Sequence, residues 1–213
     1  MRRAVPHLRE EKALRAEGYE FIAGIDEAGR GALMGPVVAA AVILPARLSG
    51  SWRSQVRDSK LLTPARREAL YEEITGAAVA WGVGATSSED IDAVGIAPAT
   101  RRAMLTAVAQ LRQAPDYLLI DYFKLPETPL PQHGIVHGDA VCFSIACASI
   151  IAKVTRDRRV TDLDTTYPGY GFANHKGYGT EDHMACLRRL GPCPVHRRSF
   201  HPVRALMGRD GTA

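Results

Sequence analysis

The feature that most constrains the fold is a pair of apolar segments, residues 21–27 and 37–44, separated by a loop rich in glycine. The second segment, Val-Val-Ala-Ala-Ala-Val-Ile-Leu, contains no polar residue, which is typical of a fully buried strand. Gly35 and Pro36 stand just before it and interrupt the chain. We therefore expect two strands that pair antiparallel across the loop formed by residues 28–36.

The first of these strands ends in two adjacent carboxylates, Asp26 and Glu27, and Arg30 follows between Gly29 and Gly31. Neighbouring side chains of a strand point to opposite faces, so the two acids share one site only if the pleat breaks just after them. The two glycines supply a break and let backbone N–H groups approach a ligand closely. This segment favours a divalent-metal site that faces a phosphate; the alternative is an acidic turn at a strand end.

The rest of the chain alternates strands with helices, which predicts an α/β fold with antiparallel strands at the front and parallel strands after the helices. We expect one domain over residues 1–213, with a helical and irregular C-terminal part from about residue 165 and an irregular basic tail after residue 190. The further strands are expected at residues 79–85, 117–121 and 134–137, and the helices at residues 8–18, from Thr63 and Pro64 onward, from Ser88 onward, and at 97–113, 140–164 and 180–190.

Composition limits the setting in which the chain works. With 213 residues, 46% of them hydrophobic, it is long enough for one good-sized core. A net charge of +4 is compatible with a polyanionic partner. No apolar run has the length of a membrane span and no signal peptide is evident, so we expect a cytoplasmic protein. The four cysteines show no Cys-x-x-Cys spacing, which indicates reduced thiols, with Cys142 and Cys147 buried, and argues against zinc.

Two further acids fall where the expected sheet ends. Asp121 closes the strand at residues 117–121, and Asp139 precedes a long helix, whose N-terminus favours negative charge. Together with Asp26 and Glu27 they would repel one another unless cations neutralise them, and oxygen-only ligands suit Mg²⁺ or Mn²⁺. Two such ions roughly 4 Å apart would serve phosphodiester hydrolysis. The alternatives are that Asp121 caps a loop and that Asp139 caps the helix.

Seven motifs, taken in order, make the chain resemble a bacterial-type ribonuclease HII over nearly its whole length. The resemblance implies an RNase H-like mixed five-stranded sheet flanked by helices, with a C-terminal helical extension. The motifs are Gly-Ile-Asp-Glu-Ala-Gly-Arg-Gly at 24–31, Asp-Ser-Lys at 58–60, Leu-Ile-Asp at 119–121, Gly-Asp at 138–139, Ala-Ser-Ile-Ile-Ala-Lys-Val-Thr-Arg-Asp at 148–157, His-Lys-Gly-Tyr-Gly-Thr at 175–180 and His-Arg-Arg-Ser-Phe at 196–200.

By this resemblance the four acids would be the catalytic residues of a metal site that uses Mn²⁺ or Mg²⁺. Gly29, Arg30 and Gly31 would sense the 2′-hydroxyl of a ribonucleotide, and Tyr178 would pack on the deoxyribose that follows it. The resemblance implies an endoribonuclease, working as a monomer, that cuts the RNA strand of RNA/DNA hybrids and incises 5′ of ribonucleotides embedded in duplex DNA. It would leave 5′-phosphate and 3′-hydroxyl ends and serve ribonucleotide excision and RNA primer removal.

Several basic residues in or near these motifs are candidates for contacts with backbone phosphates, and for each the alternative is a solvated surface charge. We place Lys60 and Lys176 foremost among them. The full set is Lys60, Lys153, Arg156, Lys176, Arg197 and Arg198.

Asp157 is left out of the catalytic set. In an unbroken helix it would lie 18 residues after Asp139, roughly 27 Å away, which is too far for one metal site. We expect it to pair with Arg158 or Arg159, or to orient the surface that faces the substrate. Two-metal hydrolysis needs no histidine base, so we assign no catalytic role to the histidines at 175, 183 and 201.

Three positions depart from the family pattern. Tyr122-Phe123 replaces the usual Gly-Asn, Leu61 replaces a lysine, and His137 replaces another lysine. Because the acids are retained, we expect weaker substrate binding and intact chemistry. Arg30 in the turn and the missing N-terminal substrate-binding domain disfavour ribonuclease HIII. The rival functions are a DNA junction resolvase or transposase-like nuclease, and a nucleic-acid-binding protein without catalysis.

Overall fold

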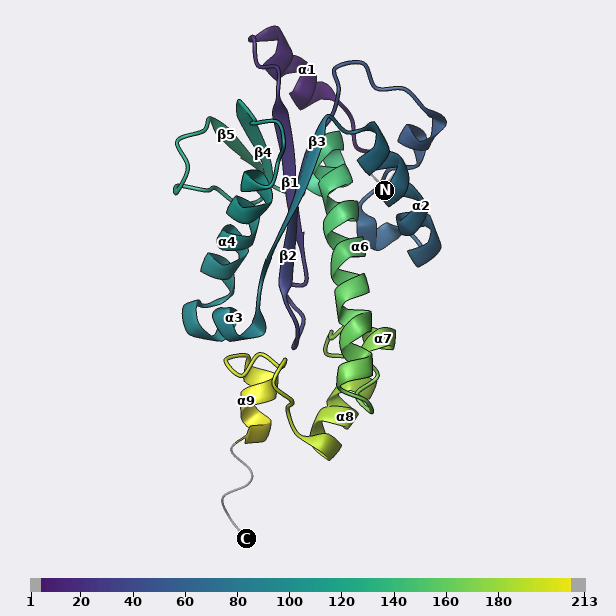
Figure 1. Ribbon diagram of the computed structural model, residues 1–213, viewed down its shortest axis with the longest axis vertical. Helices are drawn as coiled ribbons and strands as arrows, with labels where there is room; N and C mark the ends of the chain where they lie inside the picture. The colour runs from purple at the N-terminus through teal and green to yellow at the C-terminus, as the bar shows by residue number, and fades with distance from the viewer. Residues whose placement is uncertain (1–4, 208–213) are drawn as a thin grey trace.

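The computed structural model describes residues 5–207, which form a mixed five-stranded sheet between two layers of helices (Figure 1). The strand order is β3-β2-β1-β4-β5. β2 pairs antiparallel with both β1 and β3, whereas β4 pairs parallel with both β1 and β5. This confirms the predicted fold class and the predicted antiparallel pair at the front. The strands are β1 (Ile22–Ala28), β2 (Val37–Ile43), β3 (Ala80–Thr86), β4 (Tyr117–Asp121) and β5 (Gln132–Ile135).

Helices cover both faces of the sheet and lie at both of its ends in Figure 1, with α1 at the upper end. α4 packs on β2 and β3, and α6 packs on the other face against β1 and β2. Beyond the lower end of the sheet lie α7, α8 and α9. The helices are α1 (Arg9–Ala16), α2 (Pro64–Ala77), α3 (Ser88–Val94), α4 (Ile96–Ala109), α5 (Gly138–Val141), α6 (Phe143–Thr166), α7 (Phe172–His175), α8 (Glu181–Leu190) and α9 (His201–Met207), with 3-10 turns η1 (Ser51–Gln55) and η2 (Ser59–Leu61).

β2 is apolar throughout because both of its faces are covered. Ala39, Ala41 and Ile43 belong to the core cluster on the α4 side. Ala40 and Val42 belong to the cluster on the α6 side. The alternation of a strand thus supplies two cores at once, as the run without polar residues predicted.

Small residues bring α6 close to the sheet. A Cβ atom placed on Gly24 of β1 would lie 2.3 Å from the backbone carbon of Ser144 in α6, so only glycine fits at this point. The close approach of α6 fixes one wall of the region in which β1 ends.

The helix predicted at residues 140–164 is wrong in one respect, because the chain forms two helices there. Cys142 has an extended backbone, with φ −101° and ψ 127°, and separates α5 from α6. The cause is a distant segment: His7 N donates to Val141 O at 2.9 Å, and Phe143 N donates to His7 O at 3.1 Å. Asp139 therefore lies on the short helix α5, and the premise of an unbroken helix from Asp139 to Asp157 fails.

Other boundaries also differ from the predicted ones. β5 lies two residues earlier than expected, because His137 takes a left-handed conformation, φ 55°, at the start of α5. The helix expected to reach residue 113 ends at Ala109, and the tail expected to be irregular contains α9. Thr63 caps α2 as predicted, since its Oγ1 accepts from Arg66 N.

Residues 1–4 and 208–213, which include the basic start and the end of the tail, lie outside the described residues. Among residues 5–207, no helix combines the length and the apolar character needed to cross a membrane.

Candidate active site

Two of the four acids leave the sheet side by side. β1 and β4 are parallel neighbours, and their register pairs Ile25 with Ile120, the residues just before Asp26 and Asp121. The carboxyl ends of adjacent parallel strands meet at one edge of a sheet, so both carboxylates emerge together. Asp121 also accepts a hydrogen bond from Gly138 N at 2.7 Å through its Oδ1 atom, which joins β4 to α5.

The other two acids come from the end of β1 and from α5. β1 continues one residue past Glu27, and the chain turns at Gly29, where φ is +94°. The chain thus turns at Gly29, as predicted, and the strand ends one residue later than predicted. Asp139 is buried on α5, and its Oδ2 lies 3.2 Å from Lys60 Nζ. The fold therefore brings the four predicted acids together, and their role as metal ligands stays a prediction.

A cleft of about 490 Å³, here called the acid cleft, opens over these residues. Asp26, Glu27 and Asp121 line it, and Asp139 lies beside it, bound to the lining residue Lys60. The remaining lining residues come from the glycine turn, the Ser59 turn, α2, α6 and the Tyr178 loop: Ala28, Gly29, Arg30, Gly31, Ser59, Arg67, Ser149, Lys153 and Tyr178.

The electrostatics of the acid cleft favour binding of a cation. Burial, and then the charges of Glu27, Asp121 and Asp139, raise the pKa of Asp26 well above its usual value. Burial raises the pKa of Glu27 to about 7, although Arg30 opposes the rise. Burial and Asp139 also raise the pKa of Asp121. Crowded, poorly solvated carboxylates hold protons until a metal ion or another cation replaces them.

The donor atoms fit a hard divalent cation. All four side chains offer oxygen, and Glu27 Oε2 is buried with no hydrogen-bond partner in the described part of the chain. Within residues 5–207, however, no three His, Cys, Asp or Glu side chains already stand as a metal-binding group. The Lys60 ammonium forms an ion pair with Asp139, so the Lys60 and Asp139 side chains would have to shift for a metal ion to bind Asp139.

The two glycines of the turn differ in what requires them. Gly29 has a positive φ, and a Cβ there would overlap the side chain of Arg156. At Gly31 a Cβ would meet nothing within 4 Å, and the residue is exposed on the cleft. Between them, the Arg30 guanidinium lies 4.7 Å from the centre of the Phe123 ring. Phe123, one of the residues that depart from the family pattern, thus packs against the Arg30 guanidinium.

Arg156 and Arg197 were candidates for phosphate contacts, with a solvated surface charge as the alternative; both interpretations are wrong, because both side chains are fully buried. Arg197 is held among backbone carbonyls, and burial together with Arg156 lowers its pKa to about 9. The two side chains tie the glycine turn and its loop to the C-terminal part of the chain. Arg156 donates to the carbonyls of Met34, Pro36 and Lys176, and Arg197 to those of Arg30, Ala32 and Gly35.

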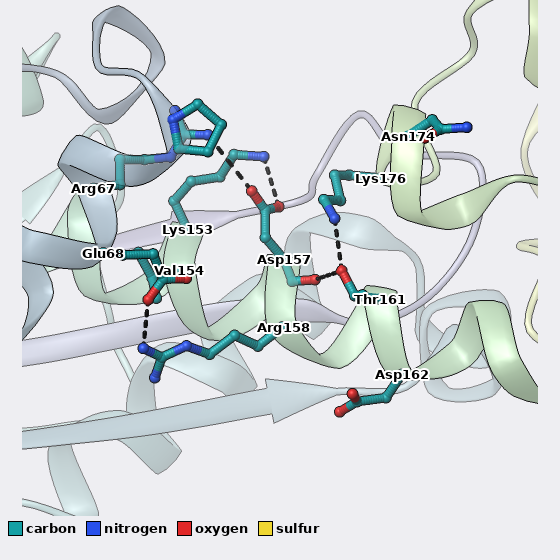
Figure 2. Close-up of a pocket in the computed structure, with 11 residues that line it drawn as sticks. Arg67, Glu68, Lys153, Val154, Asp157, Arg158, Thr161, Asp162, Asn174 and Lys176 are labelled. Atoms are coloured by element: carbon teal, nitrogen blue, oxygen red, sulfur yellow. Dashed lines mark hydrogen bonds and ion pairs between the residues drawn. The ribbon is translucent and has the colours of Figure 1, made fainter.

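Tyr178 lines the acid cleft, and two cations lie near its ring. Lys153 Nζ lies 5.3 Å and Arg156 Cζ 5.4 Å from the ring centre. Lys176 lies elsewhere: its Nζ donates to Thr161 Oγ1 at 2.6 Å. It lines a second hollow of about 470 Å³, here called the side pocket, which shares Arg67 and Lys153 with the acid cleft (Figure 2).

Sequence reasoning missed three polar residues that line the acid cleft, Ser59, Arg67 and Ser149. The two serines lie inside quoted motifs, and Ser149 Oγ donates to Ser59 Oγ at 2.8 Å. Arg67 donates from Nη1 to Ser59 O at 2.9 Å and to Leu62 O at 2.6 Å. Nothing in the sequence marks Arg67, because its partners are backbone atoms of a preceding turn and a carboxylate 90 residues away, that of Asp157.

Within residues 5–207, no histidine lines the acid cleft. His183 and His196 instead face each other in the C-terminal part, with 3.1 Å between their Nε2 atoms. Burial lowers the pKa of each to about 4. Cys142 and Cys147 are buried free thiols, as expected.

The chain is similar to several known proteins over most of its length. The family model described as Ribonuclease HII matches residues 23–203. A protein of Dehalococcoides mccartyi named Ribonuclease HII is 59% identical over 202 residues, which cover 95% of each chain. The solved ribonuclease H2 of Pyrococcus horikoshii has a TM-score of 0.74 and 26% identity, covering 88% of this chain and 97% of that one. The RNase HII of Archaeoglobus fulgidus, solved in complex with PCNA, has a TM-score of 0.71 and 29% identity, covering 90% and 98%.

Proposed function

The chain belongs to the ribonuclease HII family and is a ribonuclease H of type 2, and we propose that it incises 5′ of ribonucleotides embedded in duplex DNA as well as cutting the RNA strand of RNA/DNA hybrids. The observation that carries the proposal is the acid cleft, in which buried carboxylates with raised pKa values lie beside a glycine turn that is open to a ligand. We further propose that the protein is a cytoplasmic monomer serving ribonucleotide excision and RNA primer removal.

Asp26, Glu27, Asp121 and Asp139 would hold the metal, Mn²⁺ or Mg²⁺, as their oxygen donors favour. Burial and mutual repulsion raise the pKa values of the first three acids. A bound cation would offset their negative charge and so stabilise the ionised carboxylates. When bound, a pair of such ions supplies an activated water and stabilises the leaving oxygen of a phosphodiester, giving 5′-phosphate and 3′-hydroxyl ends. Because the pKa of Glu27 is about 7, this residue gives up its proton readily when a cation arrives.

The glycine turn and Tyr178 would supply the selectivity. A 2′-hydroxyl both donates and accepts hydrogen bonds, so the backbone of Gly29, Arg30 and Gly31 can recognise it without reading a base. The ring of Tyr178 would pack on the deoxyribose that follows, where a ribose would be crowded. Lys60 in the acid cleft and Lys176 in the side pocket would contact phosphates, which set affinity and not specificity.

The experiment that tests the proposal is cleavage of an end-labelled DNA duplex that contains one ribonucleotide, beside an all-DNA duplex of the same sequence. Each is incubated with Mg²⁺ or Mn²⁺ and then with chelator. We expect one metal-dependent cut on the 5′ side of the ribonucleotide and no cut in the control. Equal cutting of both duplexes would indicate a DNA nuclease, and cutting of neither would indicate a binding protein.

A further inference from the structure

Asp157 remains without a role in the proposed function, and its surroundings differ from the expected ones. It does not pair with Arg158 or Arg159; Arg158 instead pairs with Glu68 and Glu72. Asp157 Oδ1 lies 2.8 Å from Lys153 Nζ, and Asp157 Oδ2 lies 3.8 Å from Arg67 Nη2. Figure 2 shows the carboxylate on the wall of the side pocket, joined by a dashed line to each of these two cations.

These three side chains are largely shielded from water. Their exposed fractions are 16% for Asp157, 15% for Lys153 and 12% for Arg67. Ion pairs in such surroundings are screened much less than pairs on an open surface, so they hold their geometry better. The Asp157 pairs thus differ from the exposed pairs that Arg158 makes in the same pocket.

Both cations lead from Asp157 to the acid cleft, which Asp157 itself does not line. Lys153 stands over the ring of Tyr178, with its Nζ 5.3 Å from the ring centre. Arg67 holds the carbonyls of Ser59 and Leu62, and thereby the turn that carries Lys60. Asp157 therefore touches, through one partner each, two groups proposed to meet the substrate.

The charge balance gives Asp157 its importance. Arg156 also lies against Tyr178, and its hydrogen bonds go to backbone carbonyls. Three cations, Arg67, Lys153 and Arg156, thus lie near Tyr178 or Asp157, and the Asp157 carboxylate pairs with two of them, Lys153 and Arg67. Without its charge, Lys153 and Arg67 would repel each other and leave the shared wall of the two hollows.

We propose that Asp157 is a positioning residue, which holds Lys153 against Tyr178 and Arg67 against the Ser59 turn so that the acid cleft receives a ribonucleotide junction in register. The inference rests on the proposed function, since it assumes that Tyr178 meets the substrate. A mere surface acid at this place would act in the opposite direction, because removing a negative charge near a polyanion strengthens binding.

That opposite sign gives a sharp test with a matched control. Asp157→Asn removes the charge at almost constant shape. Asp162→Asn does the same on an exposed acid of α6 that lines the same pocket and has no ion pair within residues 5–207. Each variant loses one negative charge, so the long-range attraction between protein and nucleic acid increases by the same amount in both. We measure kcat and KM on the duplex with one ribonucleotide, and thermal unfolding of each variant.

For Asp157→Asn we expect kcat to fall about tenfold, because misplaced positioning groups cost one to two orders of magnitude in rate. For Asp162→Asn we expect kcat to stay unchanged and KM to stay equal or fall. A second measurement needs no turnover: the Kd values for the ribonucleotide duplex and for all-DNA duplex, by anisotropy in chelator. Selectivity is the Kd for the all-DNA duplex divided by the Kd for the ribonucleotide duplex. Asp157→Asn should reduce this ratio, and Asp162→Asn should preserve it.

A double-mutant cycle tests whether Asp157 acts by holding Lys153, as proposed. In that case Asp157→Asn combined with Lys153→Met should be no worse than Lys153→Met alone. Asp157→Glu should restore part of the rate, since a glutamate four residues after a lysine on a helix still reaches it.

The proposal is overturned if Asp157→Asn matches Asp162→Asn in kcat and in the Kd ratio, or if the losses from Asp157→Asn and Lys153→Met simply multiply. Failure of the proposed function would look different, because the unmodified protein would then leave the ribonucleotide duplex uncut. The Kd ratio would still decide the role of Asp157 in that case.

Discussion

The acid cleft and the side pocket share two residues, but their carboxylates have opposite electrostatic surroundings. In the acid cleft, carboxylates crowd together, their pKa values are raised, and Glu27 Oε2 has no partner among the described residues. On the wall of the side pocket, Asp157 has two cationic partners. A crowded cluster of carboxylates with raised pKa values is thus prepared for an incoming cation, whereas a carboxylate paired with two cations holds other side chains in place.

The largest effect should come from an acid of the cleft. Asp26→Asn removes a predicted metal ligand at constant shape, and we expect turnover to fall by roughly a thousandfold or more, because bound metal supplies several kcal/mol of charge stabilisation. Single-turnover cleavage of the ribonucleotide duplex measures this. Asp182→Asn, an exposed acid at the start of α8, is the control. Retained turnover in Asp26→Asn would show that the metal site is assigned wrongly.

Substitutions at the two glycines of the turn test two different roles, backbone conformation at Gly29 and substrate contact at Gly31. Gly29→Ala should destabilise the protein by about 1 to 3 kcal/mol, since a side chain at this positive φ is strained and meets Arg156. Gly31→Ala should leave unfolding unchanged, because its Cβ meets nothing within 4 Å. It should nevertheless lower kcat/KM on the ribonucleotide duplex. Urea unfolding and cleavage assays test the pair, and unchanged cleavage by Gly31→Ala would argue against the turn as a substrate contact.

The raised pKa of Glu27 predicts how stability depends on pH. Its carboxyl binds a proton more tightly in the folded protein, with a pKa of about 7, than in the unfolded chain, where it is 4.5. The protonated Glu27 carboxyl therefore contributes to the free energy of unfolding below pH 4.5, and this stabilisation is lost as the pH rises through about 7. Without metal, we expect a loss on the order of 1 to 3 kcal/mol as the pH rises through this window.

Urea unfolding of the protein and of Glu27→Gln, in chelator at several pH values, measures this loss. The variant has no carboxyl to titrate at this position, so its stability should fall less over the same range. Parallel curves for the two proteins would contradict the raised pKa of Glu27. Added Mg²⁺ should stabilise the unmodified protein more at about pH 7.5 than at about pH 5, because the ion competes with protons.

The smallest effect is expected at an exposed ion pair of the side pocket. Arg158 pairs with Glu68 and Glu72, and all three side chains are about half exposed or more. Arg158→Ala should cost less than about 1 kcal/mol of stability, the usual range for such pairs. It should also leave kcat unchanged. A fall in kcat like that expected for Asp157→Asn would mean that the whole wall, and not Asp157, positions the cleft.

Much of the fold could be predicted because its signals are local. The apolar run of β2, the Thr63 cap and the acids at strand ends follow from strand alternation, capping and sheet topology. One boundary error came from a distant contact. His7 pairs with Cys142 and splits the predicted long helix, and no pattern within residues 140–164 contains that information.

Local sequence was enough to place two acids at the end of β1, one at the end of β4, and glycines after the first pair, because side-chain and backbone preferences act over a few residues. Which charges can face a substrate depends instead on tertiary contacts. Arg156 and Arg197 resemble surface cations in the sequence, but they are buried among carbonyls of the loop that follows β1. Asp157 joins α2 to α6. Burial and pairing depend on residues far apart in the chain, which only the folded molecule brings together.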